Sequence, residues 1–486
     1  MLSWPTIGVL LVGTLIGCIT GILPGIGGPV TLVLLLPVVF AIGDPTIAFA
    51  LMLGTHAVQN TANSASAILL GVPGDNAAQA LLMDGTPMAR KGEAGRALGA
   101  AFSASAVGGL FGAVIFAGSI PVVMALLKVF GSPEMLMLSL WGLSMVAVLS
   151  GEVPLKGLAM AAVGLLLTTV GLDPQRAIPR YTFGEPYFYD GLTLISISLG
   201  LFAAPVAVEL IQKRTLFTAD APATKVSDVG AGIRDTFHHW PLLLRNSALG
   251  TFLGIIPGIG GSVIDWLSYG STVQLAKDKE NFGKGDVRGV IGPDAATNSK
   301  EGGALIPTIA FGIPGSTGMA IMLGAFLGLG LIPGRVILTE HKELLFSFVW
   351  ILAISNVVAA ILLLSIAKHL AKVTLVRASI LASFVFTFTI LGAYMAQQDA
   401  MDLVLLAGFS LLGCIMHQYN WPRPPLLLGF VLGGVLERYL FLSFNAYGPA
   451  WMLRPGVIIL AILIALSMFS LRKRGVQKPT KEDGAG

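Results

Sequence analysis

The first lysine or arginine of the chain is Arg90, and the residues before it are mainly leucine, valine, isoleucine, alanine and glycine. Over all 486 residues, 55% are hydrophobic and 12% are charged, whereas an ordinary soluble domain carries about 25% charged residues. So few charges cannot cover the surface of a soluble globule of this size. The composition therefore predicts an all-α polytopic membrane protein embedded in a lipid bilayer.

Apolar runs of about 17–25 residues are long enough to cross a bilayer as helices, and the chain contains a series of them. Outside two irregular regions, we expect spans at residues 99–127, 135–150, 155–172, 190–211, 344–367, 376–396, 401–418, 425–441 and 455–471. Together with the irregular regions, these runs predict about 10–14 membrane segments.

The two irregular regions, residues 13–90 and 247–335, resemble each other. Each enters the pentapeptide PGIGG, at 24–28 and 257–261, and each closes on a G-V/I-P-G motif, at 71–74 and 312–315. Between the two motifs lies a polar segment of small residues, NTANSASA at 60–67 or DAATNSKEGGA at 294–304. Two such matches in the same order indicate an internal repeat.

Basic residues orient the spans, because cytoplasmic loops of membrane proteins are enriched in lysine and arginine. The tail 472–486 and the stretch 212–246 are basic, so both are expected in the cytoplasm. Counting spans from them, the second repeat starts inside and ends outside, while the first ends inside, near Arg90 and Arg96. We therefore expect two inverted repeats, with the N-terminus outside and the C-terminus in the cytoplasm.

This organisation divides the chain into six parts. They are a first repeat core (1–98), the scaffold helices of the first half (99–211), a cytoplasmic connection (212–246), a second repeat core (247–335), the scaffold helices of the second half (336–471) and a cytoplasmic tail (472–486). Inverted repeats with interrupted hydrophobic segments indicate the binding site of a secondary transporter.

A helix that is interrupted within the membrane frees N–H groups at one end and C=O groups at the other, which suit an anion and a cation respectively. Proline ends a helix and glycine lets the backbone approach a ligand. The predicted helix-break residues are Pro24, Gly25, Gly27, Pro73, Pro257, Gly258, Gly260 and Pro314. The predicted substrate-binding residues are Asn63, Ser64, Ser66, Gly74, Asp75, Asn76, Asn298, Ser299, Gly315, Ser316 and Thr317. Glycine–proline breaks also serve as kinks and close packing sites in ordinary membrane bundles, and this alternative remains open.

Four ionisable residues lie near the motifs. Lys300 and Glu301 are candidates because an ionisable group within the membrane is functional by default, although they could also pair with each other at a water-exposed mouth. His56 is interpreted as a packing residue. Asp265 has no acidic counterpart in the first repeat, where Leu32 stands.

Other classes of function find little support in the chain. A phosphate-binding loop is excluded, because no Lys-Ser/Thr follows either PGIGG and no GxGxxG occurs there. Catalytic and metal-binding constellations with usable spacing are missing from the sequence, so we expect neither an enzyme nor a cofactor. Cys18 and Cys414 form no disulfide framework, and the net charge of +4 calls for no nucleic acid.

The second repeat closely resembles the large permease subunit of tripartite tricarboxylate transporters, through ENFGKG, GGALIPT and FGIPGS in this order and spacing. The first repeat is similar through GILPGIGG, ILLGVPGDNA and DGTPMARKGEAGRALG. The polar segments QNTANSASAILLG and the pair Asn298–Ser299 depart from the usual pattern of the family. The resemblance implies a bacterial inner-membrane importer of a small carboxylate, with a small membrane subunit and a periplasmic solute-binding protein as partners.

We therefore expect a permease that imports a di- or tricarboxylate, driven by an ion gradient. Sodium is the favoured coupling ion, with protons as the alternative, because the sequence predicts a site that is rich in carbonyls and hydroxyls and poor in buried carboxylates. A passive anion channel, with the PGIGG loops as its filter, is an alternative function, and a membrane-embedded scaffold or enzyme subunit is another.

Overall fold

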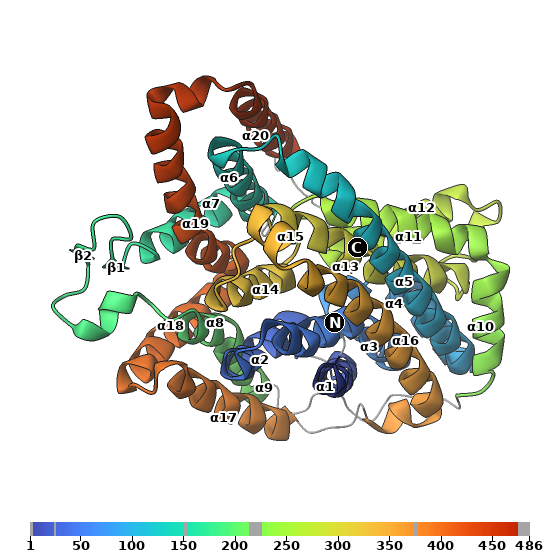
Figure 1. The fold of residues 1–486 in the computed structure, drawn as a ribbon. Coiled ribbons are helices and arrows are strands. Elements are labelled where there is room, and N and C mark those ends of the chain that lie inside the picture. Colours follow the sequence, from blue (N-terminus) through green and yellow to red (C-terminus); the bar gives the residue numbers. More distant parts are fainter. Residues whose placement is uncertain (1–2, 24–25, 150–152, 213–225, 374–377, 475–486) are drawn as a thin grey trace, which may run out of the picture. The chain divides into compact units, whose positions relative to one another are not determined.

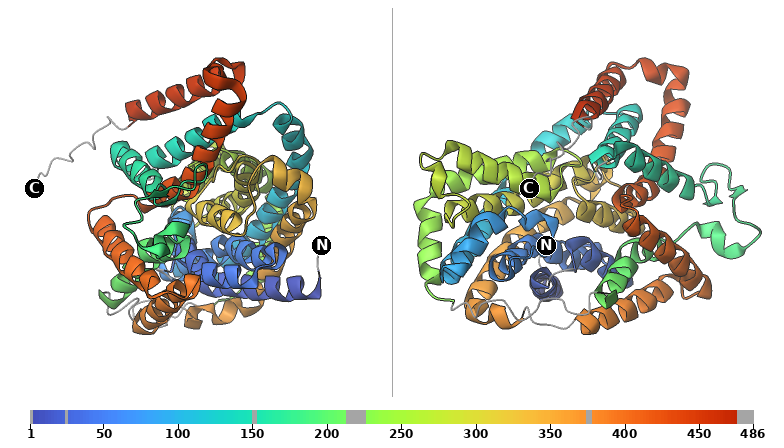
Figure 2. Two further views of the ribbon diagram at one scale, coloured as in Figure 1. Left: turned by 60° about the vertical axis from the view of Figure 1, so that its left-hand side comes forward. Right: turned by 180° about the vertical axis from the view of Figure 1, so that it is seen from behind.

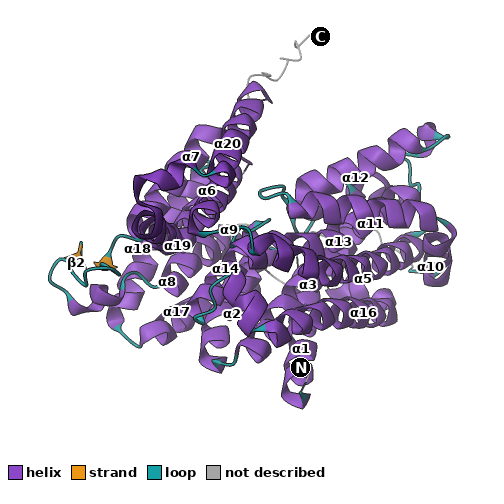
Figure 3. Ribbon diagram, turned by 45° about the horizontal axis from the view of Figure 1, so that its top comes forward, coloured by secondary structure: helices purple, strands orange, loops and turns teal. Residues whose placement is uncertain are grey.

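The computed structural model describes residues 3–23, 26–149, 153–212, 226–373 and 378–474. The predicted break residues Pro24 and Gly25 lie outside this described part, as does the tail 475–486. The described residues are almost entirely helical, apart from a two-stranded antiparallel hairpin (Figure 3). The prediction of an all-α polytopic membrane protein is confirmed.

The elements of the first half are, in chain order (Figure 1), α1 (Trp4–Ile22), α2 (Gly28–Ile42), α3 (Pro45–Leu70), η1 (Asn76–Ala78), α4 (Leu81–Arg90), α5 (Ala94–Leu127), α6 (Ser132–Leu149), α7 (Pro154–Leu167), β1 (Gly171–Leu172), β2 (Pro179–Arg180), η2 (Pro186–Asp190), α8 (Leu194–Ser198), the π-helical turn η3 (Leu199–Ala203) and α9 (Ala204–Gln212). Those of the second half are α10 (Val229–His238), α11 (Trp240–Ile255), α12 (Gly261–Leu275), η4 (Lys279–Asn281), α13 (Arg288–Phe311), α14 (Thr317–Gly328), α15 (Arg335–Glu340), α16 (Lys342–Val373), α17 (Ala378–Gln397), α18 (Ala400–Gln418), α19 (Arg423–Tyr447), η5 (Gly448–Leu453) and α20 (Pro455–Arg474).

Seven helices within the described residues are long and apolar enough to cross a membrane: Trp4–Ile22, Ala94–Leu127, Leu194–Gln212, Lys342–Leu370, Ile380–Gln397, Ala400–Gln418 and Arg423–Leu453. Shorter apolar helices lie at Gly28–Ile42, Pro154–Leu167, Thr317–Gly328 and Pro455–Leu466. The helices of the two repeat cores are interrupted and more polar, which is why only α1 among them is in the first group.

By its internal contacts the chain forms two compact units. Unit 1 contains residues 1–127 and 193–415, and therefore both repeat cores. Unit 2 contains residues 128–192 and 416–486. The six-part division expected from the sequence stays a prediction.

The predicted repeat appears in unit 1 as the same series of helices used twice. In the first repeat, α1 and α2 flank the PGIGG break, and α3 and η1–α4 flank the second break. In the second repeat, α11 and α12 flank PGIGG, and α13 and α14 flank the second break. The helices after PGIGG, α2 and α12, both have 15 residues. The opposite membrane orientation of the two repeats rests on the charge count.

The backbone conformations at the breaks match between the repeats. α3 ends at Gly71 (φ 66°) and α13 ends at Gly312 (φ 67°), in the left-handed region that only glycine adopts readily. Downstream, Asp75 and Ser316 are both extended N-cap residues. The Asp75 side chain accepts a hydrogen bond from the backbone of Ala77, and that of Ser316 accepts one from Met319. The two repeats therefore share one backbone design.

Glycines set how the helices of each repeat pack. A side chain on Gly17 or Gly21 of α1 would collide with the backbone of α3, and one on Gly250 or Gly254 of α11 would collide with the backbone of α13. Glycine at every fourth position lets two membrane helices approach closely, as in other small-xxx-small contacts. Gly21 contacts Gln59 of α3, and Gly254 contacts Lys300 of α13. Gln59 and Lys300 are therefore equivalent positions in the two repeats.

The helices α3 and α13 are buried on nearly all sides, from Ala48 to Leu69 and from Gly289 to Ala310. A helix that is buried all round belongs to the core of its domain. Each also packs against the long helix of the other half, since α5 lies along α13 and α16 lies along α3. Figure 2 shows the long helix α16 beside the first-repeat helices α1 and α3. The polar segments predicted from the sequence are thus in the core of unit 1.

Unit 2 is built from α6, α7, the hairpin, α19 and α20. α7 packs closely on α19, because Gly164 and Gly429 each lie against the backbone of the other helix. The hairpin pairs Gly171 with Arg180, and the Arg180 guanidinium lies 2.7 Å from the Glu437 carboxylate of α19. Glu134 of α6 accepts a hydrogen bond of 2.8 Å from Arg454, just before α20. These ion pairs join the connecting segments to the helices of this unit.

The glycine contact between α1 and α3 leads to a stability prediction. Gly17→Leu should lower the free energy of unfolding by about 1–3 kcal/mol or more, because the new side chain meets the Thr55 carbonyl and backbone cannot move aside as a flexible side chain can. The measurement is the unfolding midpoint of the protein purified in detergent. Gly8→Leu is the matched control, because nothing lies within 4 Å of a side chain there. Equal midpoints for both variants would contradict the close helix contact.

Candidate functional site

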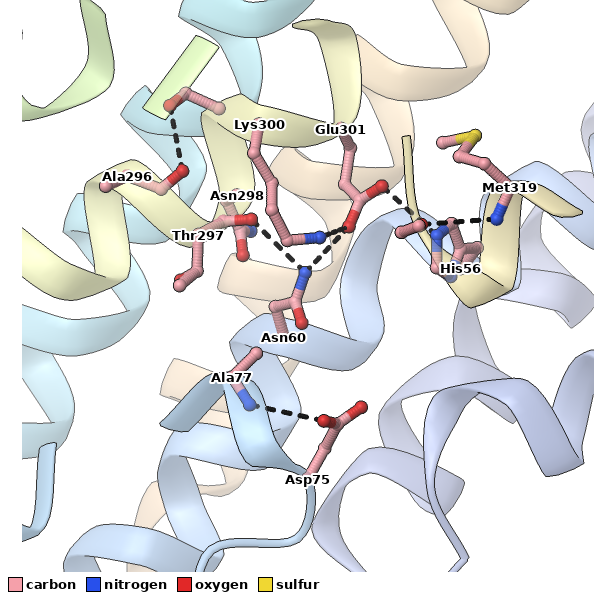
Figure 4. A network of polar contacts seen from close by, with 12 residues as sticks. His56, Asn60, Asp75, Ala77, Ala296, Thr297, Asn298, Lys300, Glu301 and Met319 are labelled. Carbon is pink, nitrogen blue, oxygen red and sulfur yellow. Dashed lines mark hydrogen bonds and ion pairs between the residues drawn. The ribbon is translucent and has the colours of Figure 1, made fainter. Parts of the chain in front are cut away.

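A cluster of charged and polar side chains lies in the core of unit 1, between α3 of the first repeat and α13 of the second (Figure 4). The Lys300 ammonium contacts the Glu301 carboxylate. Asn60 donates a hydrogen bond of 3.0 Å to Oε1 of Glu301. Nε2 of His56 lies 3.1 Å from the other oxygen, Oε2, close enough for an ion pair when the ring is protonated, although neither atom makes a hydrogen bond within the described part of the chain.

The charges of this cluster are buried. Lys300 is 5% exposed, Glu301 1% and His56 7%. Among the residues that the structure describes, Lys300 is the only lysine or arginine in the buried class. Taking an ammonium and a carboxylate out of water is costly, and the contact between them offsets that cost only while both partners are present. The sequence allowed for such a pair at a water-exposed mouth, but the structure places it in the core.

The cluster extends to the broken helices of the second repeat. Cε of Lys300 lies 3.1 Å from the point at which a side chain on Gly261, the first residue of α12, would begin. The His56 ring lies against Gly318, in the first turn of α14. The N-terminal ends of α12 and α14 carry partial positive charge, and Gly260 has no side chain with which to cap α12. An ammonium beside an uncapped helix N-terminus can bind an anionic group, such as a carboxylate.

Two of the predicted substrate-binding residues lie at the second break of the first repeat. The Asn63 side chain points its oxygen at Gly74, and Ser66 donates a hydrogen bond of 2.9 Å to the backbone carbonyl of Asn63. The carbonyl oxygen of Gly21, at the end of α1, lies beside Gly74 as well. These two side chains therefore face the break, and their role in binding substrate stays a prediction.

Three other predicted residues are directed toward neighbouring helices. Ser64 donates a hydrogen bond of 2.5 Å to the buried Asp294. Asn298 donates to Thr61 (2.6 Å) and to Asn356 of α16 (2.8 Å). Ser299 donates to the backbone carbonyl of Ser247 in α11, at 2.8 Å. In this conformation they connect helices to one another and do not face the breaks.

The remaining predicted residues form the breaks themselves. Asp75 and Ser316 are helix caps, Asn76 begins η1 and Thr317 begins α14. Gly315 lies against the carbonyl of Gly254, just as Gly74 lies against that of Gly21. The other break residues in the described part are Gly27, Pro73, Pro257, Gly258, Gly260 and Pro314; Gly258 has a φ of 79°.

Sequence reasoning missed Gln59, Asn60, Asp294 and Asn356. Aligning the repeats on their glycines would have drawn attention to the first two, because that alignment sets Gln59 opposite Lys300 and Asn60 opposite Glu301. Sequence reasoning also assigned a packing role to His56, whereas in the structure the His56 ring faces the Glu301 carboxylate. The premise that the site is poor in buried carboxylates was wrong, since Glu301 and Asp294 are each 1% exposed.

Carboxylates also connect the two repeats outside this cluster. Asp265 of α12 accepts a hydrogen bond of 2.7 Å from the backbone of Ala80, where α4 begins. Asp84 of α4 accepts hydrogen bonds from Gly285 (2.8 Å) and Asp286 (2.9 Å) in the loop before α13. These contacts fix the ends of α12 and α13 to the first repeat.

The outer part of the loop before α13 has charged partners of its own. Arg288 donates hydrogen bonds to both oxygens of Asp278, at 2.9 and 2.7 Å. These hydrogen bonds to the guanidinium lower the pKa of Asp278 to about 2. The carboxylate is therefore charged throughout the physiological pH range.

Fold and site together define a class of protein: a polytopic membrane protein with repeated broken helices and a buried charged cluster between the repeats, as found in secondary transporters. The chain matches the tripartite tricarboxylate transporter TctA family over residues 7–428, and it belongs to this family. The resemblance seen in the sequence motifs is thus confirmed.

Two relatives come from Agrobacterium vitis. The chain is 31% identical over 429 residues to the "Uncharacterized 52.8 kDa protein in TAR-I ttuC' 3'region", covering 88% of this chain and 85% of the relative. It is also 31% identical over 191 residues to the "Uncharacterized protein in TAR-II ttuC' 3'region", covering 39% of this chain and 79% of that relative. No solved structure was found to match the chain.

The charge pair of the cluster can be tested by a double-mutant cycle. Lys300→Met should lower the free energy of unfolding by about 3–5 kcal/mol, because it leaves the buried Glu301 carboxylate without its cation. Adding Glu301→Gln to that variant should restore most of the loss, since the uncompensated charge is then gone. Unfolding in detergent gives the free energies of the wild type, the two single variants and the double variant. Additive effects of the two substitutions would show that the two side chains are not coupled.

Proposed function

We propose that this chain is the permease subunit of a binding-protein-dependent secondary transporter, and that it imports a small di- or tricarboxylate driven by an ion gradient. Membership of the TctA family supports the transporter class. The observation that carries the substrate class is the buried Lys300 ammonium, next to the N-terminal end of a broken helix. A carboxylate is the anion that such a group binds most simply.

The substrate carboxylate would take the place of Glu301 on the Lys300 ammonium. In the present conformation Glu301 neutralises Lys300, so the ammonium is already removed from water before substrate arrives. A substrate carboxylate that displaces Glu301 therefore does not have to desolvate the cation. His56 lies at the other carboxylate oxygen of Glu301, and Asn60 donates to the oxygen that Lys300 contacts. Both side chains would retain Glu301 once it has been displaced. A second carboxylate of the substrate would lie at the free N–H groups of α12.

The partners follow from the family. A tripartite transporter includes a small membrane subunit and a solute-binding protein, and we propose that both act with this chain in the inner membrane of a bacterium. The basic tail 472–486 would lie in the cytoplasm and the N-terminus outside. The transporter class also argues against an enzymatic role.

Uptake in cells that express the three subunits tests this function. The wild type should accumulate a labelled carboxylate, drawn from a panel of succinate, malonate and citrate, above its external concentration, and collapse of the ion gradient should stop accumulation. The double variant Lys300→Met/Glu301→Gln, which is expected to fold, should reduce uptake about thirty-fold or more, because removing a buried charged partner costs about 2–5 kcal/mol.

The control for this experiment is Lys279→Met, at an exposed lysine of η4, which should transport like the wild type. Uptake that only equilibrates the two sides would favour the passive channel over a secondary transporter. Full uptake by the double variant would rule out Lys300 as the group that binds substrate.

A further inference from the structure

A second polar group lies at the breaks of the first repeat, and it consists of oxygen atoms, two of which, on Gln59 and Asn63, have no hydrogen-bond donor among the described residues. Gln59 is 6% exposed. Its amide nitrogen donates to the Thr20 hydroxyl at 3.3 Å, and that hydroxyl gives its own proton to the carbonyl of Ile16. Since Thr20 can therefore only accept from Gln59, the amide orientation is determined by the hydrogen bonds.

The amide oxygen of Gln59 is left without a partner in the described part of the chain. It lies 2.8 Å from the point at which a side chain on Gly28 would begin. Oδ2 of Asp75 lies 3.7 Å from the same point. A buried amide oxygen and a carboxylate oxygen thus lie near one another at the start of α2.

Three more oxygens surround Gly74, a few residues away. They are Oδ1 of Asn63, Oγ of Ser66 and the carbonyl of Gly21, and all lie within 3.1 Å of the point where a side chain of residue 74 would begin. Asn63 is 2% exposed, and its Oδ1 has no hydrogen-bond partner among the described residues. The Ser66 proton is already used by the Asn63 backbone. A buried acceptor without a donor normally destabilises the folded protein.

We infer that these oxygens bind a sodium ion, with Gln59, Asn63 and Asp75 as the side chains of the site and the Gly21 carbonyl as a backbone ligand. Carbonyl and carboxylate oxygens are the ligands of hard cations. Asp75 is the one carboxylate of the group, so its charge matches a monovalent ion better than a divalent one. Gly21 is in the last turn of α1, whose C-terminal end carries partial negative charge, as at other sodium sites built on broken helices.

The sodium site would occur only in the first repeat, because the second repeat has other residues at the equivalent positions. At the aligned positions Lys300 stands for Gln59, Ala304 for Asn63, Pro307 for Ser66 and Ser316 for Asp75. Three of the oxygen-bearing groups are replaced by groups that cannot coordinate a cation, and the carboxylate becomes a hydroxyl. Lys300 reaches the start of α12 as Gln59 reaches the start of α2. The second repeat carries an ammonium of its own where the first would bind its ion.

This division gives the coupling in the proposed function a structural basis, and that role rests on the proposed function. Sodium at the first repeat would join α1 to the second break through Gly21 and Asn63. Asn60, which follows Gln59 in α3, donates a hydrogen bond to Glu301 of the anion site. Ion binding on one face of α3 would therefore stabilise the arrangement in which Lys300 receives the carboxylate.

The test is sodium binding by the purified full-length protein alone, without carboxylate or partner subunits. NaCl should raise the unfolding midpoint in a saturable way relative to KCl at equal ionic strength, because a ligand that binds only the folded state stabilises it. Asn63→Ala should raise the half-saturating sodium concentration about tenfold or more, the effect of losing a ligand worth about 1.4 kcal/mol. Asn281→Ala, the same change at an exposed residue of η4 outside both sites, should leave it within about twofold.

A second variant keeps the test decisive if Asn63→Ala fails to fold. Gln59→Lys transfers the lysine of the second repeat into the first, so its ammonium should replace the ion and make the midpoint independent of sodium. Equal stabilisation of the wild type by sodium and potassium would overturn the site, and so would unchanged sodium dependence in Gln59→Lys. Sodium binding that persists in a protein without carboxylate uptake would instead contradict the proposed function alone.

Discussion

A helix that ends within a membrane exposes backbone N–H and C=O groups that lipid cannot satisfy, so broken helices persist only where protein surrounds them. The structure meets this constraint by close glycine contacts. Gly17 and Gly21 bring α1 onto α3, and Gly250 and Gly254 bring α11 onto α13. The long helices α5 and α16 then cover α13 and α3. The cluster of Lys300, Glu301, Asn60 and His56 lies between α3 and α13, within this packing.

The two repeats use one backbone for different chemistry. Their breaks have matching dihedral angles at Gly71 and Gly312, but the side chains around the breaks differ. The first repeat presents amide and carboxylate oxygens, and the second presents the Lys300 ammonium. A transporter that couples an anion to a cation needs both kinds of site near each other, and diverged repeats provide them without a new backbone.

The fold could be predicted further than the site. Long apolar runs found α5, α16, α17 and α18 within a few residues, because hydropathy and length are enough to identify a span. The repeat was visible because glycine and proline are required wherever a helix must stop. No comparable signal indicates which face of α3 or α13 meets a break, since both helices are buried all round and have no polar side.

That lack of a polar side explains why some of the predicted residues face a break and others contact neighbouring helices. Asn63 and Ser66 were predicted together with Ser64, but a helix places Ser64 on another face, where it meets Asp294. Asn298 and Ser299 were chosen for their polarity, and they bond to α3, α16 and α11 instead. Gln59 was passed over because it is opposite Lys300 only when the repeats are aligned on their second breaks, residues 71–74 with 312–315.

The proposed site places a carboxylate between the repeats, on Lys300. An experimental density map of the protein, determined by electron cryomicroscopy in sodium chloride with a saturating carboxylate, tests it most directly. We predict density for the ligand in contact with the Lys300 ammonium and the first turn of α12, with Glu301 displaced. Ligand density elsewhere, with the contact between Lys300 and Glu301 intact, would contradict it.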